Sequence, residues 1–238
     1  FVHGYNVSFD DGIFRTAQIA HDIGFDGPAI SFSWPSRGSA WAYRHDVDTS
    51  KGSRDALRGM LELIALDTSI VSVNLVAHSM GNAPVTEVLG ALGEIRRSGG
   101  QLRDLKLREI VLAAPDVSRT VFEQLAAKFA GQARGGITLY ASASDKAMLI
   151  SKKLAGELVR AGDVTGGRPV VVRGIESIDV TNAGTSFFST NHTTFADRED
   201  LVEDMRSLFE TGKHPPSARA SVFKPMGSGG GMWWQYRR

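Results

Sequence analysis

The apolar positions of this 238-residue chain form two patterns that alternate along its length. Short continuous apolar runs, such as 71–77, are typical of strands that are buried on both faces. Between these runs lie longer segments in which apolar residues recur at helical spacing. The pattern predicts strands at 1–3, 29–34, 71–77, 109–114 and 137–141, a last strand or pair at 170–173 and 177–181, and helices at 12–24, 49–66, about 80–95, 118–130, about 146–161 and 197–211.

Strand and helix alternate throughout, which predicts an α/β fold with a mostly parallel sheet flanked by helices. The alternation ends near residue 212, so we divide the chain into an α/β domain at 1–212 and a tail at 213–238. The tail is rich in Gly and Pro, and the glycines of 227–231 indicate a flexible linker. Its aromatic end, 233–236, either docks on the body of the protein or is a local peculiarity.

The chain begins at Phe1, inside what we predict to be a strand, and without an initiator Met. We therefore expect that the natural N-terminus has been cut away and that the first strands of the domain are lacking. No signal peptide is visible, which favours the cytoplasm, although an export signal could have been removed with the missing part.

Composition excludes several classes of protein. Hydrophobic residues make up 42% and charged residues 22%, which is typical of a globular protein and not of a disordered one. The formal net charge of +1 gives no sign of a nucleic-acid partner. No apolar run is long enough for an integral membrane segment. Cysteine is absent, which excludes disulfides and a cysteine nucleophile, and we expect neither a metal nor another cofactor.

The most informative segment is Ala77-His78-Ser79-Met80-Gly81, which follows an apolar strand and opens a helix. A serine at such a junction, with small residues two positions before and after it, is typical of a nucleophile elbow. The usual motif has Gly at both of these positions, so Ala77 is a departure from it. The pattern predicts Ser79 as a catalytic nucleophile.

A serine nucleophile needs a base, and the base needs an acid that orients it. Only His192 and His214 follow Ser79 in the chain. We predict His192 as the base, because it lies in a polar loop between the last strand and the last helix. His214 follows the last helix and is expected to be a solvated cation at its end.

Two aspartates compete for the role of the acid. Asp145 follows the second strand after the predicted elbow, and Asp116 follows the first. We favour Asp145, because a histidine from the next connection is better reached from there. Asp116 remains an alternative that could instead cap a helix, and Asp179 is a distant third.

Acyl transfer also needs two N–H donors for the developing oxyanion. One is expected to be the N–H of Met80, directly after the nucleophile. The segment Val2-His3-Gly4-Tyr5-Asn6 fits the loop that supplies the other, with Tyr5 as the first choice and Asn6 as the second. A plain turn at the end of a strand is the alternative interpretation.

Next to this predicted site lies a loop, 35–47, that is rich in Gly, Ser and aromatic residues. Trp41 and Tyr43 could bind the acyl group of a substrate, or they could pack as in any loop. No long insertion precedes the last helix to act as a lid, which favours small soluble esters.

These motifs together, with Ser33-Trp34-Pro35-Ser36 and Ala113-Ala114-Pro115-Asp116, resemble the α/β-hydrolase superfamily. More narrowly, residues 1–211 resemble bacterial esterase/lipase-like hydrolases of poorly characterised function. The resemblance implies an eight-stranded, mostly parallel sheet, of which this chain supplies the third to eighth strands. It also implies a triad of Ser79, Asp145 and His192, with Tyr5 and Met80 as oxyanion donors.

The expected function is therefore a serine hydrolase that cleaves carboxylic esters with short to medium acyl chains through an acyl-enzyme. The expected partner is a small-molecule ester; the oligomeric state is left open. An amidase, peptidase or acyltransferase on the same triad is an alternative, and a binding module without turnover is another.

Overall fold

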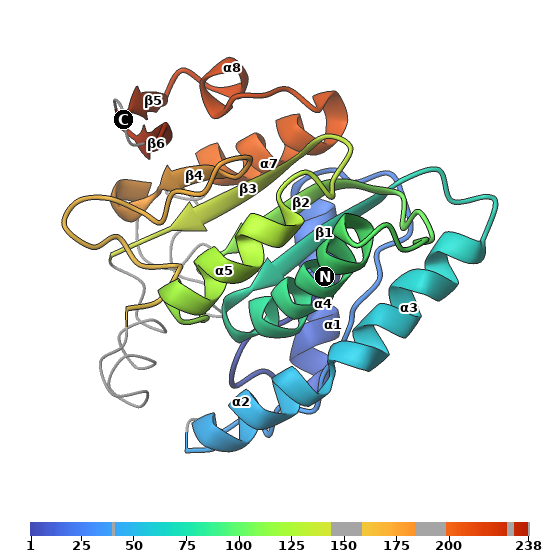
Figure 1. Cartoon of the computed structure of the whole chain (residues 1–238). Helices are drawn as coiled ribbons and strands as arrows, with labels where there is room; N and C mark the ends of the chain where they lie inside the picture. Colours follow the sequence, from blue (N-terminus) through green and yellow to red (C-terminus); the bar gives the residue numbers. More distant parts are fainter. Residues whose placement is uncertain (40, 144–158, 184–198, 228–230, 238) are drawn as a thin grey trace.

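The computed structural model describes residues 1–39, 41–143, 159–183, 199–227 and 231–237. Their centre is a six-stranded sheet in the order β1-β2-β3-β4-β6-β5, in which every neighbouring pair is parallel except β5 and β6 (Figure 1). The predicted α/β fold with a mostly parallel sheet is confirmed. The strands are β1 (Val73–His78), β2 (Leu107–Ala113), β3 (Gly136–Ala141), β4 (Glu176–Asp179), β5 (Phe223–Met226) and β6 (Trp233–Tyr236).

Two short extended segments continue the sheet beyond β1. Val2 forms parallel bridges with both Ala77 and Phe32, so the first segment of the chain lies between β1 and the segment around Phe32. The predicted strands 1–3 and 29–34 are thus reduced to single bridges. The first is short because the chain turns directly after His3, and the second lies between Pro28 and Pro35, which lack the N–H that would lengthen a ladder.

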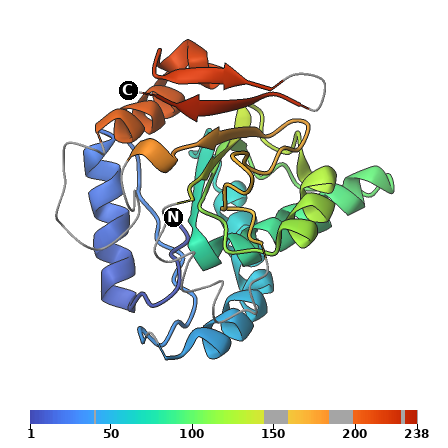
Figure 2. The same cartoon turned by 90° about the vertical axis from the view of Figure 1, so that its left-hand side faces the viewer.

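Helices cover both faces of the sheet. Figure 2 shows α1 and α7 on one side and α3, α4 and α5 on the other. Alternate residues of β2 supply the two resulting cores: Ile110 and Leu112 belong to one, and Val111 and Ala113 to the other. This double burial explains why the strands have continuous apolar runs. The helices named here are α1 (Phe9–Asp22), α3 (Arg54–Leu66), α4 (Asn82–Arg97), α5 (Arg119–Phe129) and α7 (Glu199–Thr211).

The region predicted as a loop at 35–47 and a helix at 49–66 differs from that prediction. A separate helix, α2 (Tyr43–Gly52), begins inside the predicted loop and ends just before Ser53, after which α3 begins. The buried residues of α2 are Tyr43, Asp46 and Ser50, so no apolar stripe marks it as a helix in the sequence.

Two further predictions concern the end of the domain. Of the two runs predicted as the last strand or pair, only the second forms a strand, β4; residues 170–173 do not pair as one. Most of the helix predicted at about 146–161 lies outside the described residues.

The tail joins the sheet. After α8 (Pro216–Arg219), β5 and β6 form a hairpin, and β6 pairs with β4 through Ile178 and Trp234. Trp233, Trp234 and Tyr236 are buried, so the aromatic end docks on the body of the protein. The Arg219 guanidinium, in α8, also lies 2.6 Å from the Asp204 carboxylate, and both side chains are fully buried. Of the helices in the described ranges, none combines the length and apolarity needed to cross a bilayer.

Candidate active site

Ser79 stands at the carboxyl end of β1, at the first residue of the 3₁₀ turn η1 (Ser79–Gly81) that leads into α4. Its φ angle is 50°, in the left-handed region that side-chain-bearing residues rarely adopt. Such a conformation costs about 1–3 kcal/mol and persists only where surrounding contacts hold it, most often at functional sites. The strained strand–turn–helix junction is that of a nucleophile elbow.

The small residues around Ser79 have clear packing reasons. A Cβ on Gly81 would lie 2.3 Å from the His3 carbonyl oxygen and 2.7 Å from that of Val2, so only glycine allows the turn to approach this segment. Ala77 is fully buried and pairs with Val2 on one side and Leu112 on the other. Its methyl group is accommodated there, which explains the departure from the usual glycine.

Asn82 holds the far side of the elbow. Its side-chain amide donates to the carbonyl oxygens of Ser79, at 3.0 Å, and Ala113, at 3.2 Å, and the residue is fully buried. The N–H of Asp116 also donates to the Ser79 carbonyl, at 3.1 Å. These bonds join the elbow to the end of β2. Sequence reasoning missed this role of Asn82, although the residue directly follows the motif.

The first turn of the chain lies against Ser79. A Cβ on Gly4 would lie 3.0 Å from the Ser79 Cβ and 2.9 Å from the His78 Nδ1, so the Gly4 backbone is in close contact with the elbow. Tyr5 follows, and its ring meets that of Tyr43 edge to face at 5.3 Å between centroids. The Asn6 N–H donates to Asp46 Oδ2 at 3.4 Å, so the second-choice oxyanion donor already has an acceptor.

The predicted base, His192, and the predicted acid, Asp145, both lie outside the described residues. His214 differs from its prediction as a solvated cation. Its Nδ1 lies 2.8 Å from a Glu176 carboxylate oxygen and its Nε2 lies 3.2 Å from one of Glu109. These glutamates belong to the amino-terminal part of β4 and β2, at the sheet end opposite to Ser79, so His214 bridges two strands there.

Two histidines lie near the elbow: His3 is buried and His78 is partly buried. The His3 ring stacks on that of Trp34 at 4.8 Å, its nitrogens lie near the carbonyl oxygens of Gly4 and Trp34, and burial lowers its pKa. Burial, together with the positive charge of Arg15, lowers the pKa of His78 to about 3. Both imidazoles are therefore neutral at pH 7, and the contacts of His3 give it a structural role.

The alternative acids have partners of their own. The Asp116 carboxylate accepts a hydrogen bond from the Tyr43 hydroxyl at 3.2 Å and lies 3.2 Å from the Arg160 Nε, in a largely buried ion pair. Asp179 accepts hydrogen bonds from the backbone and side chain of Thr181 and from Gln235, which places it in the turn after β4.

A cavity of about 470 Å³ lies beside the elbow, between α2, α4 and the start of α5. Met80, Tyr43, Asp116 and Arg160 contribute to its wall. Trp41 does not, and it is 98% exposed. The cavity's apolar wall consists of Val47, Met80, Ala83, Val117, Val121 and Leu125.

The described ranges contain no group of three or more His, Asp or Glu side chains placed to hold a metal ion. A family model of α/β hydrolases of unknown function, DUF900, matches residues 1–209. The chain belongs to this family. No curated protein and no solved structure matches it.

Membership in DUF900 confirms the expected resemblance to poorly characterised α/β hydrolases and makes the chain a hydrolase. The matched region contains Ser79, the glycines Gly4 and Gly81 that lie against or beside it, and the strands β1 to β4. It ends before α8 and the β5–β6 hairpin, which lie outside the family model.

In this DUF900 hydrolase, Gly81→Ala is expected to lower the free energy of unfolding by about 1–3 kcal/mol, because the new methyl group overlaps two backbone carbonyls. Gly59→Ala is the matched control. Gly59 lies inside α3, and a Cβ added there would have no other atom within 4 Å, so alanine is expected to add about 0.5–1 kcal/mol. Urea unfolding of both variants measures the difference; equal stability would contradict the packing of the elbow described above.

Proposed function

We propose that this protein is a serine hydrolase that cleaves carboxylic esters, with Ser79 as the nucleophile. The observation that carries the proposal is the left-handed conformation of Ser79 at the head of α4. A serine in ordinary helix or strand geometry would serve packing equally well without the cost of strain. The helix amino terminus also presents its partial positive charge where an oxyanion would develop.

The proposed reaction proceeds through an acyl-enzyme. His192 accepts the proton of Ser79 Oγ as the oxygen attacks the ester carbonyl carbon, and Asp145 orients the imidazole. The N–H groups of Tyr5 and Met80 donate to the resulting oxyanion. The intermediate collapses, the C–O bond to the alcohol breaks, and His192 returns its proton to the departing oxygen. Water, activated by the same imidazole, then releases the acid from Ser79.

Two contacts favour the proposed assignments over their alternatives. The Asp116 carboxylate is engaged by Arg160 and Tyr43, which favours Asp145 as the acid. The Asn6 N–H points to Asp46, which favours Tyr5 as the oxyanion donor.

The cavity next to Met80 is proposed to bind the acyl group. Tyr43 lines this cavity, which supports its proposed role as a substrate-binding residue. The apolar wall of the cavity suits an uncharged acyl chain. Asp116 and Arg160 at its wall form an ion pair, and the other charged residues of the lining are balanced in number: Arg44, Lys51, Asp48 and Glu87. Each buried methylene contributes about 0.8 kcal/mol, so kcat/KM should rise roughly fourfold per added methylene until the cavity is filled. Trp41, fully in solvent here, is proposed to meet the substrate only at the rim.

An amidase, peptidase or acyltransferase would use the same residues, and each is an outcome of a substrate test. Amide cleavage identifies the first two. An acyltransferase gives a new ester when an alcohol is added. A binding module would retain the fold without a reactive serine.

Wild-type protein is expected to react with a fluorophosphonate probe and to hydrolyse p-nitrophenyl butyrate, because both reactions need an activated serine. Ser79→Ala should do neither. Ser98→Ala is the control, since Ser98 is exposed at the other end of α4 and should leave both reactions unchanged. Labelling of the Ser79→Ala variant at the wild-type rate would refute the assignment of the nucleophile.

The base and acid are tested on the same ester. His192→Ala and Asp145→Asn are each expected to lower kcat by at least roughly 10⁴-fold without unfolding the protein, as losses of this kind do in other triads. Asp116→Asn should retain most of its activity, because its carboxylate serves Arg160 and Tyr43. His21→Ala, at an exposed site, is the control. If Asp116→Asn lost activity while Asp145→Asn kept it, Asp116 would be the acid.

Val121→Trp is expected to shorten the acyl chains that the enzyme accepts. Val121 is 45% exposed on α5 and lines the cavity, so a larger ring can fill the cavity without entering the core. Its kcat/KM should fall at least tenfold for p-nitrophenyl octanoate and stay within twofold for the acetate. Gln124→Trp, exposed on the same helix and outside the cavity, is the control. An unchanged chain-length profile would place the acyl group elsewhere.

A further inference from the structure

Two features near the site have no role in the proposed reaction: the segment Ser33-Trp34-Pro35-Ser36 and the carboxylate of Asp46. The Asp46 residue is fully buried, in the first turn of α2. Among the described Lys and Arg side chains, none lies within 4 Å of it, and the Nδ1 of the partly exposed His45 lies 3.3 Å from its Oδ1. A buried carboxylate without a strong cation is costly unless several donors satisfy it.

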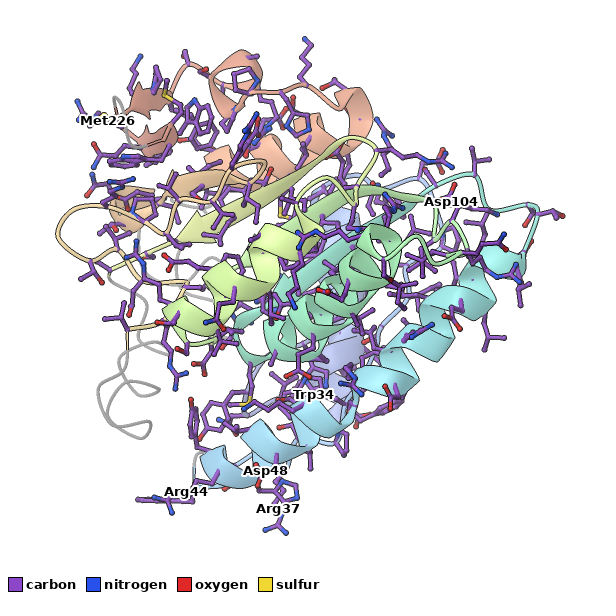
Figure 3. All side chains as sticks on the ribbon, viewed as in Figure 1. Trp34, Arg37, Arg44, Asp48, Asp104 and Met226 are labelled. Carbon is purple, nitrogen blue, oxygen red and sulfur yellow. The ribbon has the colours of Figure 1, made fainter. Side chains whose placement is uncertain are left out.

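The donors come from two loops. Asp46 accepts hydrogen bonds from the Ser36 hydroxyl at 2.6 Å, from the Arg37 N–H at 3.0 Å and from the Asn6 N–H at 3.4 Å. Figure 3 shows Arg37 near the start of α2, in agreement with these bonds. One carboxylate thus joins α2 to the loop that precedes it and to the turn beside Ser79.

Ser36 extends the same arrangement. Its hydroxyl oxygen accepts from the N–H of Val7 at 3.3 Å and from the N–H of Gly38 at 3.2 Å. Asn6 and Val7 are consecutive, so Asp46 and Ser36 together hold the downstream end of the turn at Gly4–Asn6.

The upstream end of that turn is held by Trp34. Its indole N–H donates to the His3 carbonyl at 2.8 Å, and its ring stacks on the imidazole of His3. Gly4 and Tyr5 therefore lie between two fixed points. Asn6 has a φ angle of 55°, a left-handed conformation that needs such support.

We infer that Asp46, acting with Ser36, is the positioning residue of the oxyanion loop: it fixes the Asn6 turn and so aims the Tyr5 N–H at the oxyanion formed on Ser79. This inference rests on the proposed function. An aspartate holds this turn better than an asparagine would. Both oxygens of a carboxylate accept hydrogen bonds, whereas the NH₂ group of an amide would face at least one of the donors from Ser36, Arg37 and Asn6 and could not accept from it. A donor displaced by about 1 Å can cost roughly 100-fold in rate.

Asp46→Asn is therefore expected to lower kcat for p-nitrophenyl butyrate roughly 100-fold with KM within twofold, because ground-state binding does not use the oxyanion donor. An alkyl trifluoromethyl ketone, which forms a tetrahedral oxyanion on the serine, should bind more weakly by the same factor. The exposed Asp55→Asn in α3 is the control and should change none of these values.

Ser36→Ala and Ser36→Thr separate positioning from folding. Ser36→Ala should give a smaller loss of kcat with the same unchanged KM, and Ser36→Thr, which keeps the hydroxyl, should restore most of it. Thermal unfolding is measured for each variant. If Asp46→Asn does not fold, the inference is tested by kcat of the two Ser36 variants: equal kcat in Ser36→Ala and wild type would contradict it.

A kcat within twofold of wild type in folded Asp46→Asn, or a loss of ketone affinity that does not match the loss of kcat, would overturn the inference. Either result leaves the proposed function intact, provided that wild-type turnover depends on Ser79. Absence of turnover in the wild type would instead contradict the proposed function itself and remove the basis of this inference.

Discussion

The close approach of Gly81 to the carbonyl oxygens of Val2 and His3 is the contact on which the rest of the site depends. It places the turn after β1 directly against the first segment of the chain. Because Val2 is at the same time bridged to Ala77, the two segments leave the sheet side by side. Ser79 and Gly4 come into contact for this reason, although 75 positions separate them in the sequence. A side chain at position 81 would remove the contact and, with it, the proximity of serine and loop.

Residues with strained backbone angles lie around this contact, and hydrogen bonds hold each of them. Ser79, Asn6 and Ala114 all have positive φ angles, and each such residue costs about 1–3 kcal/mol. Hydrogen bonds to buried side chains lie next to each of them: Asn82 donates to Ser79 and to the residue before Ala114, and Asp46 accepts from Asn6. Buried polar groups that satisfy one another fix a single backbone geometry, because every alternative leaves a donor or acceptor unpaired. The site is therefore held mainly by buried polar contacts with the backbone.

The sequence predicts elements that apolar patterns or small residues at fixed spacing define, and it does not predict those that buried polar contacts define. Strands buried on both faces have continuous apolar runs, and an elbow needs small residues at fixed spacing, so β1, β2, β3 and the strained turn at Ser79 were predictable. Helix α2 was not, because its buried face carries Tyr43, Asp46 and Ser50. His214 was misjudged because its two partners lie 38 and 105 positions away, in strands that only the sheet brings together. The roles of Asp145 and His192 remain predictions, since both lie outside the described residues.

The two ends of the sheet have different tasks. At the carboxyl end, the chain turns through strained residues beside a cavity. Toward the amino end, His214 bridges Glu109 and Glu176, and Arg219 pairs with Asp204. His214 and Arg219 both belong to the segment that leads into the hairpin, so these contacts fasten the tail to the domain. The hairpin then covers the edge of β4, where unpaired backbone groups would otherwise invite association. The residues of the proposed chemistry all lie within the matched residues 1–209, and the tail completes the sheet by pairing with β4.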